Sequence, residues 1–243
     1  MTLTTAAAAS PLRRNDPAQY EQLADQWWEP RGGFAGLHWL AVARAANVPP
    51  AGRPAAVLLD VACGGGLLAP HLAAKGYRHL GIDLSPTAVR VARDHGVRPV
   101  RGDVARLPFA DGIADVVVAG EILEHVPDLP GVVGELARVL RPGGVLVLDT
   151  IARTRFARFT AITVAERMPA GPPRLLHDPA LFVDRAELRR ECAGHGIRLE
   201  LAGLRPSLSD YVGWLAGRRS GVRMLRTRST SGLFQGVGVK EPE

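Results

Sequence analysis

The stretch Val57–Gly66, which reads VLLDVACGGG, constrains the fold more than any other part of the chain. Its apolar first half is typical of a buried strand in a parallel sheet, where both faces are covered. The three glycines that follow allow a tight turn and a close approach of the backbone to a ligand. The helix predicted over residues 67–74 begins with free backbone N–H groups. The stretch therefore predicts a strand, a ligand-binding turn and a helix.

A second predicted strand, residues 79–83, ends in Asp83. An acid at this place accepts hydrogen bonds from ribose hydroxyl groups in dinucleotide-binding folds. The NAD-binding form carries G-x-G-x-x-G/A, whereas the turn here reads D-x-x-C-G-x-G, with Ala69 at the third glycine position. On these residues alone, another Rossmann-like nucleotide binder is the alternative.

The composition indicates a single α/β domain with insertions, because 243 residues with a hydrophobic fraction of 47% suffice for one core. The chain has no apolar run of eighteen residues and no recognisable signal peptide, and its two cysteines form no disulfide framework. We therefore expect a cytoplasmic protein. The net charge of +6 comes from a strong bias to arginine and, without a recognised motif, predicts no nucleic-acid partner.

The order of motifs along the chain resembles class I S-adenosylmethionine-dependent methyltransferases. The resemblance rests on the D-x-x-C-G-x-G turn, the strand that ends in Asp83, the pair Gly102–Asp103, and the LRPGG turn at 140–144. It implies an α/β, Rossmann-like fold with a seven-stranded, mostly parallel sheet, an antiparallel last strand and helical insertions.

The sequence pattern predicts five parts along the chain. They are a disordered tail (1–15), an N-terminal helical lid (16–54), a cofactor-binding core (55–150), a basic amphipathic insertion (151–180) and a C-terminal part of the sheet with a second insertion (181–243). Residues 151–177 alternate arginines with apolar side chains, which is typical of a lid over a hydrophobic substrate or of a peripheral contact with anionic lipid. A lid with solvated arginines is the plainer interpretation.

Glu121, Glu124 and His125 follow the fourth predicted strand, at the edge of the sheet where α/β proteins bind ligands. The spacing i, i+3, i+4 predicts that one helical turn brings the three side chains together. Two carboxylates and an imidazole can hold a divalent cation such as Mg²⁺. Alternatively, His125 acts as a general base, or Glu124 and His125 only cap the next helix.

Several stretches together resemble the bacterial ubiquinone-biosynthesis O-methyltransferases. They are WWE at 27–29, LDVACGGG at 59–66, EILEHVPD at 121–128, LRPGG at 140–144, and the segment from Met168 to Asp178. The resemblance implies S-adenosylmethionine as cofactor, Mg²⁺ at Glu121, Glu124 and His125, and catalytic roles for His125 and Glu121. The positions implied to bind the cofactor are Arg44, Asp60, Ala62, Gly64, Gly66, Asp83, Leu84, Asp103, Val104 and Gly120. Ala62 replaces the usual glycine, which we expect the fold to tolerate if its φ is negative.

The predicted function is methyl transfer to a phenolic or catechol hydroxyl group of a small hydrophobic molecule resembling a quinone precursor. Three alternatives stand beside it. They are a methyltransferase of secondary metabolism with another acceptor, a cofactor-binding partner protein without activity, and an RNA methyltransferase. The match is weak after Pro206, so the acceptor and the oligomeric state are not predicted.

Overall fold

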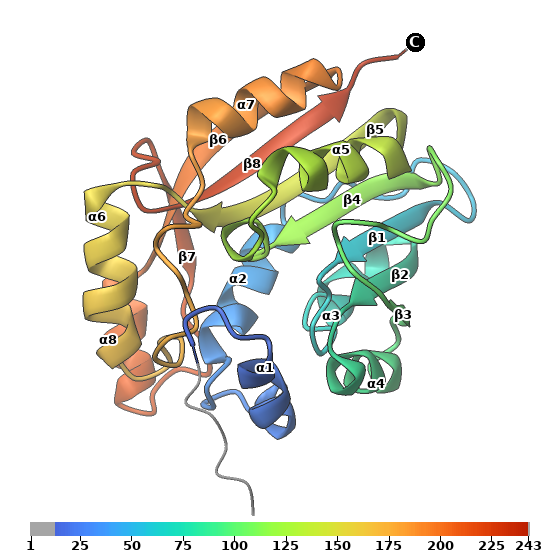
Figure 1. Ribbon diagram of the computed structural model, residues 1–243. Coiled ribbons are helices and arrows are strands. Elements are labelled where there is room, and N and C mark those ends of the chain that lie inside the picture. Colours follow the sequence, from blue (N-terminus) through green and yellow to red (C-terminus); the bar gives the residue numbers. More distant parts are fainter. Residues whose placement is uncertain (1–12, 243) are drawn as a thin grey trace, which may run out of the picture.

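The computed structural model describes residues 13–242, which form an eight-stranded sheet with helices on both faces (Figure 1). The strand order is β3-β2-β1-β4-β5-β8-β6-β7. Most of the predicted tail, residues 1–12, lies outside the described residues. Its last three residues, 13–15, pack against the loop at 175–177.

The strands are β1 (Val57–Val61), β2 (Arg78–Asp83), β3 (Arg98–Arg101), β4 (Ala114–Gly120), β5 (Leu140–Ile151), β6 (Ile197–Pro206), β7 (Met224–Thr227) and β8 (Leu233–Lys240). The first five pair in parallel, and β8 runs antiparallel between β5 and β6. The last strand is therefore antiparallel, as predicted. The sheet has one strand more than predicted, because β7 pairs with the end of β6 at the edge.

The helices on one face of the sheet are α5 (Leu129–Val139) and α7 (Arg185–Gly194), and those on the other are α2 (Ala35–Ala45) and α3 (Ala69–Leu72). Helix α4 (Pro86–Asp94) links β2 to β3. Strand β1 is buried along its whole length, as its apolar sequence predicts. Because β1 and β4 are parallel neighbours, their carboxyl ends lie at the same edge of the sheet, and the site lies at this edge.

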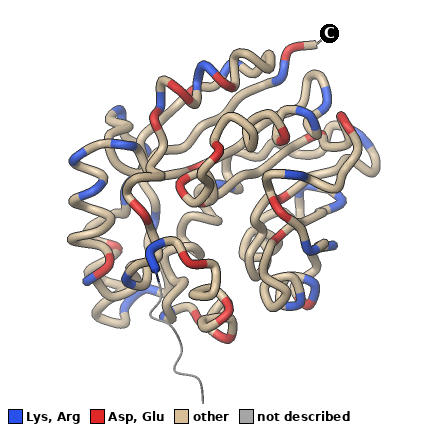
Figure 2. Tube along the Cα trace, in the orientation of Figure 1, with Lys and Arg blue, Asp and Glu red and all other residues tan. Residues whose placement is uncertain are grey.

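The two segments outside this core also fold into short helices. The predicted N-terminal helical lid begins with α1 (Ala18–Gln22) and a 3₁₀ turn, η1 (Ala24–Gln26). The insertion forms α6 (Arg155–Arg158), the π-helical η4 (Phe159–Val164) and the 3₁₀ turn η5 (Ala165–Arg167), and the second insertion forms α8 (Leu208–Leu215). Basic residues lie near α8 and along the α6 segment, by which we mean α6, η4, η5 and the residues up to Arg174 (Figure 2). Among residues 13–242, no helix combines the length and the apolar character that crossing a bilayer requires.

Candidate functional site

A cavity of about 940 Å³ opens at the carboxyl ends of β1, β2 and β4. Of the ten side chains or glycines predicted to bind the cofactor, nine line it, namely Arg44, Asp60, Ala62, Gly64, Asp83, Leu84, Asp103, Val104 and Gly120. Gly66 does not. Its φ is +80°, and an added Cβ would lie 3.1 Å from the Ala92 Cα of α4, so this glycine allows close packing of the loop on α4 instead.

Two acids, Asp60 and Asp83, lie near the carboxyl ends of β1 and β2, beside the glycine turn. The Asp83 carboxylate accepts hydrogen bonds from the backbone N–H groups of Gly64 (2.8 Å) and Ser85 (2.9 Å). A carboxylate offers about four acceptor positions, so Asp83 can still receive ribose hydroxyl groups. Asp60 is buried and lies 3.3 Å from the Nε2 atom of His79. Leu84, half exposed beside Asp83, gives the cavity an apolar wall at this end.

Ala62 has a φ of +58°, so the condition under which we expected the fold to tolerate alanine here is not met. A side chain with a Cβ pays about 1–2 kcal/mol in the left-handed region. Glu121, on the other wall of the cavity, has a φ of +52°. Strained backbone conformations of this kind are frequent at functional sites, where the surrounding contacts stabilise them.

Replacing Ala62 by glycine is expected to stabilise the cofactor-free protein by roughly 0.5–1 kcal/mol, because the relief of strain exceeds the extra entropy of an unfolded glycine. Urea denaturation measures the change. Ala73→Gly, in the 3₁₀ turn after α3, is the matched control and should destabilise the fold by a similar amount. Destabilisation by Ala62→Gly would contradict a strained loop.

Arg44 lies on α2 and points into the sheet edge. Its Nε and Nη2 atoms donate to the two carboxylate oxygens of Asp149 at 2.8 and 2.7 Å, and both side chains are buried. A Cβ at Gly120 would overlap the Arg44 guanidinium group, so this position needs a glycine. The pair fixes Arg44 on the cavity wall, where its remaining N–H groups can meet an anionic ligand.

The N-terminal segment covers the glycine turn. A Cβ on Gly64 or Gly65 would overlap the Trp27 ring, so these glycines let the indole lie directly on the turn. The Trp28 Nε1 atom donates to the Gly65 carbonyl at 2.9 Å, and the Trp28 ring stacks on His95 at 3.8 Å between ring centroids. The two tryptophans thus fasten this segment across one end of the cavity.

Glu121 lies close enough to Glu124 for the two charges to interact, but it is outside the tight group of ligand atoms that the helical spacing predicted. Glu121 lies in a bend, and only Leu123–His125 form a helical turn, the 3₁₀ helix η3. The side chains whose donor atoms lie within 4.8 Å of one another are instead those of Glu124, His125 and His177. His177 comes from the loop after the insertion, and its ring centroid is 5.1 Å from that of His125.

Burial sets the charge of this cluster. The Glu124 side chain, which accepts a hydrogen bond from Thr150 Oγ1 at 2.7 Å, is fully buried, and burial raises its pKa to about 7. Burial, followed by repulsion from Glu124, raises the pKa of Glu121 well above its usual range. Burial lowers the pKa of His125 to about 4 and that of His177 to about 3. At neutral pH both imidazoles are therefore neutral.

Glu124→Gln is expected to stabilise the cofactor-free protein above pH 7, because the folded-state pKa of about 7 exceeds the ordinary 4.5. Between these values the folded state holds more protons than the unfolded state, so this residue weakens the fold as the pH rises. From this pKa shift, the expected gain in the free energy of unfolding is about 3 kcal/mol at pH 8 and falls to about zero near pH 4. Urea denaturation at several pH values measures it, with the exposed Glu200→Gln as control. A difference independent of pH would contradict the assignment.

The residues present do not fit the Mg²⁺ site that the resemblance implied. Mg²⁺ requires mostly oxygen ligands, whereas the converging donors are one carboxylate and two imidazoles. The Nδ1 atom of His125 already contacts Asn15 Oδ1 at 2.5 Å, which leaves Nε2, 3.4 Å from the Tyr20 hydroxyl group, as its one nitrogen for a ligand. Glu124 Oε1, Glu121 Oε1 and His177 Nδ1 are buried without a hydrogen-bond partner among the described residues. These three atoms are therefore available to a bound ligand.

Roles for Asp149, Asn15, Tyr20 and His177 were not predicted from the sequence. A signal existed for Asp149, an acid near the carboxyl end of a parallel strand, as Asp60 and Asp83 are. None existed for Asn15, whose contact with His125 joins residues 110 positions apart.

Comparisons with known proteins agree with the fold. Residues 59–148 match the family described as "Methyltransferase domain". The chain is 37% identical over 194 residues to a ubiquinone biosynthesis O-methyltransferase of Thiobacillus denitrificans, covering 75% of this chain and 82% of that protein. It is 35% identical over 211 residues to the protein of the same name from Xanthomonas axonopodis, covering 82% and 87%. A Thermotoga maritima S-adenosylmethionine-dependent methyltransferase, a possible histamine N-methyltransferase, shares the fold with a TM-score of 0.61 and 17% identity, over 92% of this chain and 97% of that one.

Proposed function

The chain belongs to the ubiquinone biosynthesis O-methyltransferase family of class I S-adenosylmethionine-dependent methyltransferases, and from this premise we propose that it methylates a phenolic or catechol hydroxyl group of a small hydrophobic molecule. The observation that carries the proposal is the single cavity. We assign the glycine turn, Arg44 and the strand-end acids of its lining to a cofactor half, and the apolar side chains with His125 to an acceptor half. Donor and acceptor can then be held together in one cavity.

The residues of the first half suit S-adenosylmethionine, which supplies a methyl group bound to a sulfonium sulfur. Asp83 can accept hydrogen bonds from ribose hydroxyl groups, and Asp103 lies on the same wall. The guanidinium group of Arg44, fixed by Asp149, can bind the carboxylate of the methionine part. Leu84 and Val104 offer apolar contact to the adenine ring.

The second half suits a hydrophobic acceptor. Its apolar lining comes from α2, the insertion and β8, and includes Phe34, Leu37, Phe156, Val164 and Leu233. The cations among the described lining residues are Arg44, Arg101 and Arg205, and Arg44 is already paired with Asp149. A phenol with an apolar substituent is the acceptor that these contacts favour.

We assign His125 the role of general base. A phenol with a pKa of about 10 is mostly neutral at pH 7 and is a poor nucleophile until its proton leaves. The neutral His125 imidazole can accept that proton as the oxygen forms its bond to the methyl carbon and the bond from that carbon to sulfur breaks. The carboxylate of Glu124, next in sequence and within 4.8 Å, can stabilise the imidazolium that forms. No step of this mechanism involves Mg²⁺.

The experiment is methyl transfer from labelled S-adenosylmethionine to catechols, short-chain polyprenyl phenols, and alcohols and amines of similar size. We expect turnover of phenols with an apolar chain and an O-methyl ether as product. Turnover of the alcohols or amines alone would favour an enzyme of secondary metabolism. Cofactor binding without turnover of any acceptor would favour a partner protein without activity.

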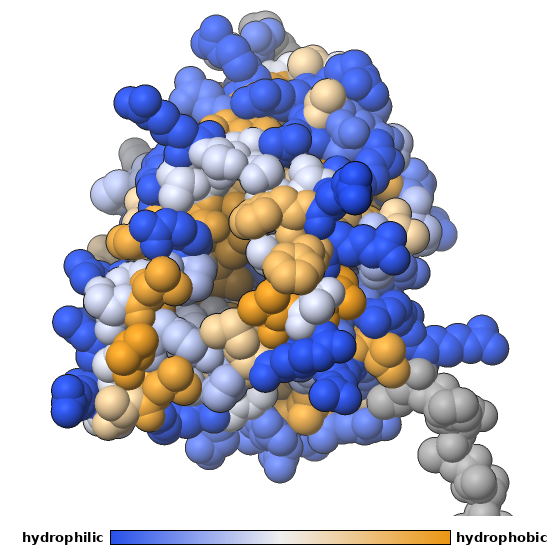
Figure 3. All heavy atoms as spheres, turned by 90° about the vertical axis from the view of Figure 1, so that its left-hand side faces the viewer, coloured by the Kyte–Doolittle hydropathy of each residue, from blue (hydrophilic) through white to orange (hydrophobic). Residues whose placement is uncertain are grey.

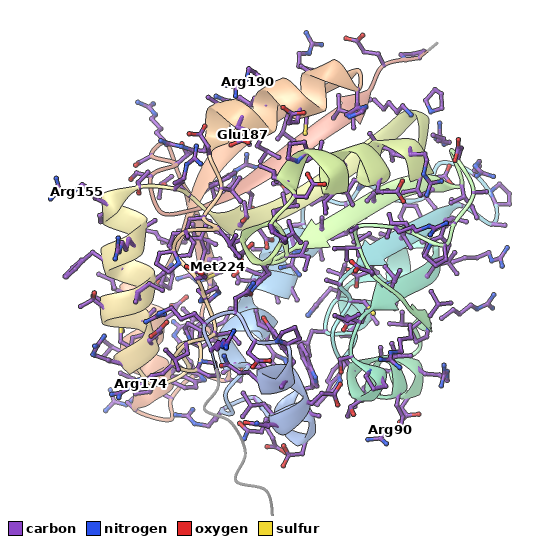
Figure 4. All side chains as sticks on the ribbon, viewed as in Figure 1. Arg90, Arg155, Arg174, Glu187, Arg190 and Met224 are labelled. Carbon is purple, nitrogen blue, oxygen red and sulfur yellow. The ribbon has the colours of Figure 1, made fainter. Side chains whose placement is uncertain are left out.

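We also propose that residues 151–177 contact an anionic membrane surface. Phe156 and Phe159 are each 57% exposed, and Leu208 on α8 is 70% exposed. Figure 3, which looks onto this side, shows hydrophobic side chains gathered near a hollow and bordered by hydrophilic ones. Arg155 and Arg174 lie near opposite ends of the α6 segment (Figure 4). Apolar side chains among cations are the pattern of a helix that lies in a lipid interface.

The double variant Phe156→Ser/Phe159→Ser is expected to weaken binding to phosphatidylglycerol vesicles about tenfold or more, because two phenyl rings lose their burial in lipid. Co-sedimentation measures the change. Val42→Ser, at a 55% exposed residue of α2, is the matched control and should bind as the unaltered protein does. Equal binding of the double variant, or equal binding to neutral phosphatidylcholine, would contradict the proposal.

A further inference from the structure

The side chain of Asn15 makes two contacts with His125. Its Nδ2 atom donates to the His125 carbonyl oxygen at 2.9 Å, and its Oδ1 atom lies 2.5 Å from His125 Nδ1. Because the first contact uses the amide N–H group, the amide oxygen faces the ring, and Nδ1 must carry the hydrogen. The neutral imidazole therefore has its lone pair on Nε2.

The Nε2 atom faces the hydroxyl group of Tyr20 at 3.4 Å, and the two rings meet edge to face with centroids 6.2 Å apart. Burial raises the pKa of Tyr20, so its hydroxyl group keeps its proton and donates. A distance of 3.4 Å is long for this type of hydrogen bond. The contact is therefore weak enough for an acceptor hydroxyl group to replace Tyr20 at Nε2, since both residues line the cavity.

Asn15 is itself held in place by the loop that carries His177. Its N–H group donates to the Leu175 carbonyl at 2.9 Å, and Gln19 Nε2 donates to the same oxygen at 3.0 Å. The φ of Asn15 is +59°, a conformation that asparagine adopts more readily than most residues. The N-terminal segment and the 175–177 loop thus close over His125 from one side.

We propose that Asn15 is a positioning residue for methyl transfer: it holds His125 as the tautomer protonated on Nδ1, with Nε2 directed into the cavity toward the acceptor. His125 is therefore correctly oriented as a base only when the N-terminal segment, with Asn15, lies over the cavity. The titratable groups that face His125 are Tyr20 from α1, Glu124 from η3 and His177 from its loop, with Arg14 bonded to the His177 carbonyl. The expected effect on turnover rests on the proposed function, in which His125 is the general base. The expected tautomer of His125 does not depend on it.

The first test is the tautomer of His125 in long-range ¹H–¹⁵N NMR spectra of the cofactor-free protein. We expect the Nδ1–H form in the unaltered protein and in Asn15→Asp, whose carboxylate still accepts the hydrogen bond. Asn15→Ala should lose this preference. Asn47→Ala is the matched control, because the Asn47 side chain is also hydrogen-bonded but lies outside the cavity.

The second test compares turnover of a catechol with that of a nitrocatechol, which is largely ionised at pH 8 and needs no base. Asn15→Ala should lower turnover of the catechol about 10- to 100-fold, as loss of an orienting hydrogen bond does elsewhere. Turnover of the nitrocatechol should change little, and Asn15→Asp should stay within about threefold of the unaltered protein for both acceptors.

Retention of the Nδ1–H form in Asn15→Ala, or equal loss of turnover for both acceptors, would overturn the proposal. Equal loss would indicate a structural role only. If the unaltered protein methylates no phenol, the proposed function fails, and the NMR spectra still decide whether Asn15 sets the tautomer. Should Asn15→Ala not fold, Asn15→Leu, which fills the same space without an acceptor, replaces it.

Discussion

Asp149→Ala is expected to destabilise the fold by about 3–5 kcal/mol, because it leaves the buried Arg44 guanidinium group without its counter-charge. The affinity for S-adenosylmethionine should fall at least about tenfold, since Arg44 is then no longer fixed on the cavity wall. Urea denaturation and calorimetric titration with the cofactor measure the two effects.

The control for this variant is Asp111→Ala. Asp111 forms an ion pair of similar length with Arg138, 2.6 Å, but its side chain is 80% exposed. Exposed ion pairs contribute about 0–1 kcal/mol, so this variant should be nearly neutral. A loss of less than about 1 kcal/mol in Asp149→Ala would mean that the buried pair does not hold the site together.

His125→Gln is expected to lower turnover of a catechol by a factor of about 10²–10⁴, the range that a general base contributes. The dissociation constant of S-adenosylmethionine should change little, because His125 lines the acceptor half of the cavity. Single-turnover kinetics and a cofactor titration separate the two quantities.

His195→Gln, at an exposed histidine beyond α7, is the control for the loss of an imidazole and should leave turnover unchanged. A decrease of less than about tenfold in His125→Gln would remove the base from the account, because positioning alone would then explain the rate.

The glycine turn and the strand-end acids could be predicted because they depend on local sequence. A buried strand, three glycines and an acid have few ways to fold in a parallel sheet, so Asp60 and Asp83 lie where the sequence places them. The Arg44–Asp149 pair could not be predicted, since the two residues are 105 positions apart and meet only once α2 packs on the sheet.

Glu121 lies outside the helical turn of Glu124 and His125 for a local reason. Helical spacing assumes helical dihedral angles throughout, and the φ of +52° at Glu121 turns the chain before the helical turn begins. No sequence pattern predicts a left-handed backbone conformation at a glutamate. His177, which takes the third place in the cluster, lies 52 residues after His125 along the chain and reaches the site only through the fold of the insertion.

The most direct measurement is turnover of a catechol by metal-stripped protein in EDTA, compared with the same protein in Mg²⁺. The account predicts equal rates, because His125 accepts the phenol proton and the donor set around it does not suit Mg²⁺. Turnover that EDTA abolishes and Mg²⁺ restores would contradict it, and would return Glu121, Glu124 and His125 to the role of metal ligands.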